Sequence, residues 1–463
     1  MMLPNGVTAR LFICSMIACW LTFSVNSAAN IEVSKFLEFG AIATDNPGLE
    51  SGDTDAELVF NLAPAVELKF AGNRFGAIAR GEIEYLRFTD AEDEIVNPNL
   101  SSKLTGTLID NLLFLDASLV ISKLSPDGNF LRLSDDDNTA AVFKVTTFLD
   151  RSFGRTADFY LAHTYSTLVD EESDSFESDQ NFVEFSLERD PQYGGFLWGV
   201  GGSYSQDNSD FNEFQNSNVY AKIGATISQT FLTELTVGIE RRDFEFEDTD
   251  NNPLIGDAEN SLLTGDQDSK VWQLDFTWTP SEFTSLKAGY GERFFGNGPT
   301  LELKHRVRNS RIVASFTRDV TRETASLDGI STLSGTTSPT IGNTDSIELT
   351  NGDLANPLDE PFVDNSFRLA YKLAGRRSDF IIDAIYSDLE RLDGEQSFET
   401  LLGRIVFDRR LSNFLSLRLQ YDHQLSQSDD FPEQDYTENR FAVKFIYHFD
   451  GVSEFDDDDL DID

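Results

Sequence analysis

Residues Phe441–Phe449 read F-A-V-K-F-I-Y-H-F, and their alternation decides which folds the chain can adopt. Every second position carries a large apolar side chain, in the set Phe441, Val443, Phe445, Tyr447 and Phe449. The gaps hold a mixed, partly polar set, Ala442, Lys444, Ile446 and His448. Because successive side chains of a β-strand point to opposite faces, the stretch predicts a strand with one aromatic face and one mixed face. In a membrane barrel the aromatic face would meet lipid and the mixed face a wet lumen.

The same alternation recurs along the chain, with almost no helical periodicity. Clear examples are Leu113–Ile121, Trp272–Trp278 and Leu415–Tyr421, where polar or charged residues separate apolar ones. Charged side chains at these positions are hard to place in a dry sandwich but natural in a water-filled barrel. The nonamer Phe441–Phe449 also looks like the C-terminal assembly signal of bacterial outer-membrane barrels. We therefore expect it to be the closing strand, paired with a first strand near Glu32–Thr44.

The links between these segments alternate in length. Short links rich in Gly, Asn, Asp and Pro suit tight turns, as at Gly72-Asn73 and Ser412-Asn413. Between them lie longer acidic stretches such as Gln206–Asn216 and Glu323–Asp364, whereas the link at Gly296–Pro299 is short where a long one is expected. Short periplasmic turns and long extracellular loops are the outer-membrane pattern. The segments predict an all-β, transmembrane antiparallel barrel of about 18–20 strands.

The two ends of the chain differ from this middle part. Arg10 precedes an apolar run, Leu11–Val25, and then Ser27-Ala28-Ala29, which predicts a signal peptide over 1–29. Both cysteines, Cys14 and Cys19, lie inside it, so the mature chain would have no disulfide. We assign 30–449 to the barrel and 450–463 to an acidic, disordered tail in the periplasm.

The charge is strongly acidic, with 36 Lys+Arg against 80 Asp+Glu and a formal net charge of −44. This excludes nucleic acid as a partner, because phosphate binding needs a basic surface. The basic residues gather beside the short links, and we predict a periplasmic basic rim of Arg151, Arg155, Arg308, Arg311, Arg376, Arg377, Arg409 and Arg410. A second set is predicted to face the lumen: Arg368, Lys372, Arg418 and Lys444. Together they would attract an anionic polymer or solute. Alternatively, each arginine only pairs with a nearby carboxylate or a lipid phosphate.

One acidic loop resembles a calcium-binding loop, with Asp248, Asp250, Asn252 and Glu259 at its first, third, fifth and twelfth positions. Pro253 takes the place of the glycine that the sharp turn needs, so an acidic surface loop is the favoured interpretation. None of the four histidines lies at a sequence spacing from a nucleophilic residue that would indicate a catalytic pair. We therefore expect neither enzymatic activity nor a cofactor.

A more specific resemblance lies in Trp278–Val320. It contains Trp278-Thr279-Pro280, then Gly289-Tyr290-Gly291, then Arg293-Phe294-Phe295-Gly296, followed by Leu303, His305, Arg306 and Arg308. Together with Thr44-Asp45-Asn46 and Pro64, these residues look like the outer-membrane barrel proteins associated with the PEP-CTERM/exosortase system. The resemblance implies a role in exopolysaccharide export or protein sorting at the outer membrane, and it carries no residue roles.

The sequence thus predicts an outer-membrane channel of a Gram-negative bacterium that serves exopolysaccharide export. Its expected partners are outer-membrane lipid, the barrel assembly machinery, periplasmic polysaccharide-export proteins and anionic polysaccharide. Three alternatives remain open: a structural or adhesive barrel plugged by its loops, a barrel enzyme, and a soluble secreted β-protein. Aromatic rings facing lipid at both strand ends would exclude the last of these.

Overall fold

The computed structural model describes residues 30–47, 56–89, 94–124, 138–170, 178–189, 195–209, 212–246, 267–321, 362–391, 397–428 and 435–450. These residues form twenty β-strands. They are β1 (Asn30–Thr44), β2 (Glu57–Ala71), β3 (Phe75–Phe88), β4 (Glu94–Ile109), β5 (Leu113–Leu124), β6 (Asn138–Ser152), β7 (Asp158–Asp170), β8 (Ser178–Glu188), β9 (Phe196–Ser209), β10 (Asn212–Ser228), β11 (Phe231–Phe246), β12 (Gln267–Ser281), β13 (Thr284–Arg293), β14 (Gly296–Val307), β15 (Ser310–Thr321), β16 (Phe362–Ala374), β17 (Ser378–Arg391), β18 (Ser397–Arg410), β19 (Leu415–Ser428) and β20 (Tyr436–His448).

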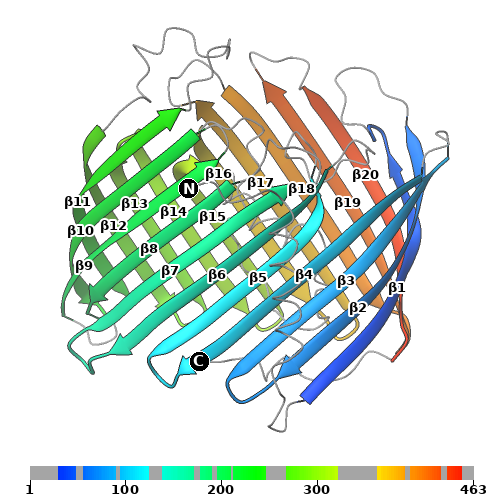
Figure 1. The fold of residues 1–463 in the computed structure, drawn as a ribbon, viewed down its shortest axis with the longest axis horizontal. Coiled ribbons are helices and arrows are strands. Elements are labelled where there is room, and N and C mark those ends of the chain that lie inside the picture. The colour runs from blue at the N-terminus through cyan, green and yellow to red at the C-terminus, as the bar shows by residue number, and fades with distance from the viewer. Residues whose placement is uncertain are drawn as a thin grey trace, which may run out of the picture.

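The strands form one closed antiparallel barrel (Figure 1). Each strand pairs with its neighbour in the chain, and β20 returns to pair with β1 in a register that runs from Phe36 opposite His448 to Thr44 opposite Arg440. The predicted fold class, strand number and closing pair are confirmed. None of the described residues forms a helix long and apolar enough to cross a membrane.

The links at one end of the barrel are short and are described in most cases, for example 229–230, 282–283 and 308–309. We call this the turn end, and the opposite end the loop end. Asn111 and Gly154 adopt positive φ angles of 57° and 66° in two turn-end links. At the loop end the prediction of a long loop over Gln206–Asn216 was wrong. Strand β9 continues to Ser209 and β10 begins at Asn212, because polar side chains can extend a strand beyond the lipid-facing part of the wall.

The two faces of the wall differ in chemistry, as the alternation predicts. Exposed outer positions are apolar over most of the circumference, as at Phe60 (50% exposed), Val219 (57%) and Phe441 (48%). The residues between them point into the barrel and are largely polar or charged. Aliphatic and aromatic side chains suit strands with one face against an apolar medium. The exposed apolar face therefore belongs in a bilayer.

Aromatic side chains mark both edges of this apolar face. At the turn end the exposed ring consists of Phe153, Phe196, Phe283, Phe414 and Phe449. Towards the loop end, outward tyrosine and tryptophan side chains bond to polar outer residues, in the pairs Tyr165–Asp179, Tyr204–Gln215, Trp272–Glu292 and Tyr421–Asn439. Amphipathic rings of this kind lie at membrane–water interfaces, with the ring in the apolar layer and the polar atom towards water. These two belts of aromatic side chains, one at each edge of the apolar face, identify a transmembrane barrel and exclude a soluble β-protein.

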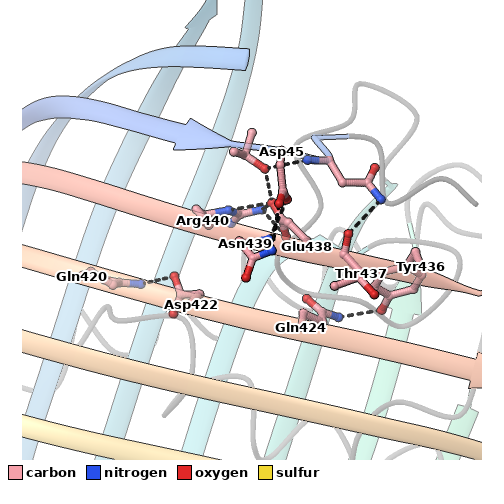
Figure 2. A network of polar contacts seen from close by, with 11 residues as sticks. Asp45, Gln420, Asp422, Gln424, Tyr436, Thr437, Glu438, Asn439 and Arg440 are labelled. Carbon is pink, nitrogen blue, oxygen red and sulfur yellow. Dashed lines mark hydrogen bonds and ion pairs between the residues drawn. The ribbon is translucent and has the colours of Figure 1, made fainter. Parts of the chain in front are cut away.

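The seam between β1 and β20 is fastened at the loop end by a polar clasp (Figure 2). Three consecutive residues bond to three others, namely Thr44, Asp45 and Asn46 to Glu438, Asn439 and Thr437. The Thr44 hydroxyl donates to Glu438 Oε1 at 2.6 Å. The two Asp45 carboxylate oxygens accept from the Asn439 backbone N–H at 2.7 Å and from its Nδ2 at 2.8 Å. Asn46 Nδ2 donates to the Thr437 carbonyl at 3.3 Å. The motif Thr44-Asp45-Asn46 therefore reinforces the loop end of the β1–β20 pair, which closes the barrel.

Candidate functional site

The inner wall formed by β16–β20 and β1–β3 carries the most concentrated set of charges among the described residues. In its turn-end half, Lys444 Nζ lies 2.7 Å from Glu38 Oε1 across the seam. Arg418 of β19 donates to both carboxylate oxygens of Asp408 on β18, at 2.8 and 3.1 Å. These bidentate and charge-assisted contacts hold the side chains flat against the wall.

A second row of ion pairs lies nearer the loop end of the same wall. Arg404 Nε donates to Asp422 Oδ1 at 2.6 Å, and Gln420 Nε2 donates to the other carboxylate oxygen of Asp422 at 2.7 Å. Arg440 donates to both carboxylate oxygens of Glu438, at 2.8 and 3.1 Å. Figure 2 shows Gln420, Asp422, Glu438 and Arg440 of this row beside the clasp. The strand register places Arg418 opposite Lys444 and Asp422 opposite Arg440, so the wall presents fixed charges of both signs.

All four residues of the predicted lumen set point into the barrel. Arg418 and Lys444 belong to the ion pairs just described, and Arg368 and Lys372 lie on β16 with exposed fractions of 4% and 1%. Sequence reasoning missed their carboxylate partners, because Glu38 and Asp408 come from other strands. The strand register brings them together, and register cannot be read from a single alternating segment.

The eight residues of the predicted basic rim all lie at the turn end, but they do not share one face of the wall. Arg311 stands opposite the inward Lys372, and Arg410 stands opposite the inward Ser416. Arg409 therefore points outward and is exposed. Of the others, Arg155, Arg308, Arg376 and Arg377 are exposed in links, and Arg151 reaches the Asn111 carbonyl at 3.5 Å. Two further basic residues at this end, Arg74 and Arg189, were missed.

The predicted assembly signal lies where its alternation places it. Phe441, Tyr447 and Phe449 are exposed on the outer face, at 48%, 39% and 53%. Strand β20 ends at His448, and Phe449 follows in a turn. The calcium candidate Asp248, Asp250, Asn252 and Glu259, the signal segment 1–29 and the tail after Asp450 lie outside the described residues. Within the described ranges, no group of three His, Cys, Asp or Glu side chains could hold a metal ion.

The opposite side of the inner wall is more open. Several of its inward charged residues on β5–β13 are only half-buried, namely Asp116, Lys144, Glu184, Glu234 and Lys287, whereas Glu240, Arg242 and Asp275 on β11 and β12 are buried. By contrast, the side chains of Arg404, Asp408, Arg418 and Arg440 are between 6% and 12% exposed. Near the loop end an apolar cluster, which includes Ile42, Val59 and Leu86, adds to the packed side. Among the described residues, the β5–β13 side therefore leaves more charged side chains in contact with solvent than the β16–β20 side.

The chain was also compared with known proteins. No family model matches, and no curated protein matches. Among solved structures, the ferric preacinetobactin receptor BauA from Acinetobacter baumannii has 10% identity and a TM-score of 0.46, with 91% of this chain and 81% of the receptor covered. The siderophore receptor PirA from Pseudomonas aeruginosa has 10% identity and a TM-score of 0.42, with 90% and 80% covered. OccK8 (OprE) from Pseudomonas aeruginosa has 11% identity and a TM-score of 0.36, with 91% and 98% covered. These neighbours are outer-membrane β-barrel proteins.

Proposed function

We propose that the chain is an outer-membrane channel whose lumen passes an anionic or hydroxyl-rich polymer. The observation that carries the proposal is the inner wall, where charged side chains run from Arg410 at the turn end to Glu438 at the loop end. A wall that only had to be stable would be filled with apolar side chains, since buried ion pairs contribute little net stability. Fixed charges of both signs give a solute alternating sites along its route.

The finer part of the proposal is exopolysaccharide export across the outer membrane of a Gram-negative bacterium. It rests on the resemblance of Trp278–Val320 and Thr44-Asp45-Asn46 to the barrels of the PEP-CTERM/exosortase system, and on the basic residues at the turn end. If that end faces the periplasm, the exposed Arg376 and Arg377 offer a docking surface for acidic regions of periplasmic export proteins. The inward Arg311 and Arg410 would attract an anionic polymer to the lumen entrance.

The test is reconstitution of the full chain in planar bilayers, with conductance and reversal potential measured in potassium chloride gradients. We expect a conducting barrel that prefers anions. Arg410→Ser should weaken the anion preference, because this side chain faces the lumen entrance. Arg409→Ser is the matched control, because Arg409 is next to Arg410 in sequence but faces outward. Equal effects of the two variants would refute the role of the rim, and a folded barrel without conductance would refute the channel.

The second candidate, a structural or adhesive barrel without conductance, is favoured by one observation. Lys372, Asp379, Asp422 and Glu438 are only 1–2% exposed, whereas residues lining a wide aqueous lumen keep contact with water. The two functions differ in their prediction for the β5–β13 side. Ser118→Glu, at a half-buried position on β5, should shift ion selectivity if solutes pass along that side, and should leave the membrane current unchanged in a closed barrel.

A further inference from the structure

The hairpin between β13 and β14 forms a distinct niche on the inner side of the loop end. The hairpin link is only 294–295, and Gly296 adopts a positive φ of 104° there. The inward positions Gly291 and Gly298 stand opposite each other and have no side chains. Arg293 of β13 reaches past β12 on one side and past β14 on the other to the strands beyond them. It lies 3.1 Å from Glu240 Oε1 on β11 and 2.7 Å from Asp319 Oδ1 on β15.

Two aromatic rings lie beside this arginine. The ring of Phe295 is centred 5.1 Å from the guanidinium carbon of Arg293. Phe294 meets Phe295 edge to face, with ring centres 4.8 Å apart and an interplanar angle of 79°. Arg242 of β11 places its guanidinium over the Phe294 ring. Guanidinium groups against aromatic faces are held in place by the ring quadrupole and by packing. The niche thus brings two aromatic rings and several charged groups together.

The floor of the niche has hydrogen-bonding capacity that the described residues do not use. Glu240 is 1% exposed and Arg242 is 9% exposed. Glu240 Oε2, Arg242 Nε and one terminal nitrogen of Arg242 have no hydrogen-bond partner among the described residues, and neither has Oδ1 of the adjacent Asn216. Buried polar atoms are nearly always satisfied in native proteins by protein, water or ligand. The floor of the niche therefore has both hydrogen-bond donors and hydrogen-bond acceptors that water or a ligand can satisfy.

The upper part of the niche is accessible. The side chain of Arg293 is 30% exposed and that of Asp319 is 64% exposed, and both phenylalanines are half-buried. The niche also adjoins the open side of the inner wall. A molecule moving along β5–β13 would meet Arg293 and Asp319 before it left the barrel at the loop end.

The chemistry of the niche selects one class of ligand. Phosphate or sulfate would use the two arginines but would be repelled by Glu240 and Asp319. A metal cation would use the carboxylates but would be repelled by the arginines. Hydroxyl groups donate and accept at once, so a polyhydroxylated ligand can satisfy both kinds of partner. The apolar C–H face of a pyranose ring also packs well on an aromatic ring.

We propose that Arg293, Phe294, Phe295 and Asp319, over a floor of Glu240 and Arg242, form a saccharide-binding site at the loop-end mouth of the barrel. A sugar ring packs on Phe295, accepts hydrogen bonds from Arg293 and donates one to Asp319. This inference rests on the proposed function, since it names the polymer that the lumen passes. It requires a polysaccharide with unsubstituted hydroxyl pairs.

The experiment is isothermal titration calorimetry of the full, folded chain in detergent micelles with maltohexaose and cellohexaose, and separately with inorganic phosphate. We expect at least one oligosaccharide to bind and phosphate not to bind. Asp319→Asn and Phe295→Leu should each weaken binding about tenfold, because replacing a charged acceptor with a neutral one, or losing a ring contact, has an effect of that size. Lys222→Gln is the matched control, because Lys222 pairs with Glu188 elsewhere on the inner wall, at 2.9 Å. It should leave binding unchanged.

Heat-modifiable electrophoretic mobility checks that each variant is a folded barrel. Absence of oligosaccharide binding by the folded wild type would overturn the proposed site, and so would equal weakening by Lys222→Gln. Binding of phosphate alone would replace the saccharide site with an anion site. The calorimetry needs no ion flow, so a conducting barrel that binds no sugar refutes this site alone, and a sugar-binding barrel that does not conduct refutes the channel alone.

Discussion

The polar clasp makes a sharp prediction for Glu438→Ala. The Glu438 carboxylate is 1% exposed and accepts from Thr44 across the seam at 2.6 Å. It also accepts from Nε of Arg440 at 3.0 Å and from its terminal nitrogen at 2.8 Å. The substitution removes all of these contacts and leaves the Arg440 guanidinium, which is 7% exposed, without this partner. It should therefore loosen the seam at the loop end and leave the turn end unchanged.

The expected cost follows from burial. Removing one member of a buried ion pair costs about 3–5 kcal/mol, because the other charge stays buried. The lost Thr44 bond adds about 1 kcal/mol. Since Arg440 lies on a lumen wall that water can reach after the substitution, we take the lower part of the range. The free energy of unfolding should fall by about 3–4 kcal/mol.

Urea titration of the barrel in lipid vesicles measures this loss, and amide hydrogen exchange locates it. Exchange should accelerate in Asp45 and Asn439, whose backbones meet at the seam. Asp422→Ala is the control, because it breaks a similar buried pair with Arg404 within the β18–β19 hairpin. That variant should lose comparable stability and should not accelerate exchange at the seam. A loss below about 1 kcal/mol for Glu438→Ala, or identical exchange patterns, would refute the reasoning.

Three further predictions follow from the wall. Phe445→Asp puts a charge on the lipid face and should cost up to about 2 kcal/mol and reduce assembly into membranes, whereas Ser118→Asp, at a half-buried position that faces the lumen, should assemble; equal yields in outer-membrane fractions would contradict the assigned faces. Gly40→Ala should prevent normal closure, because the new Cβ would meet the Val443 carbonyl oxygen and lie 2.9 Å from the Lys444 Cα, and a wild-type heat-modifiable band would contradict this. Tyr421→Phe removes the 2.8 Å bond to Asn439 at the outer aromatic ring and should cost about 1 kcal/mol in urea titrations, with Tyr371→Phe as the reference for losing a hydroxyl.

Much of the fold could be predicted from the sequence because a membrane barrel repeats one simple rule. Alternation assigned faces correctly to Phe441 and Lys444 without any knowledge of neighbouring strands. The same rule, applied to the rim, would have separated Arg409 from Arg410, since consecutive strand residues cannot face the same side. The prediction of a long loop at Gln206–Asn216 failed because strand segments that extend beyond the lipid are as polar as loops, so composition alone does not distinguish them.

The candidate site could be predicted only in part. Glu240, Arg293 and Asp319 lie on three different strands, and their contacts depend on the register of five consecutive strands, β11 to β15. A single sequence contains no signal for such contacts. The one available hint was the short link beside Gly296, which departs from the rhythm of long loops at that end.

The seam has a consequence for how the barrel reaches its correct diameter. In a closed barrel the offset at the joining pair fixes strand tilt and circumference together, so a slip of two residues would keep every side chain on its proper face and still give a wrong barrel. Asp45 opposes Asn439 only in the native offset, and Gly40 alone fits beside Val443 there. A slipped seam would bring Glu38 or Ile42 to that narrow place. Asp45 and Gly40 therefore disfavour closure of a barrel whose seam is offset by two residues from the native register.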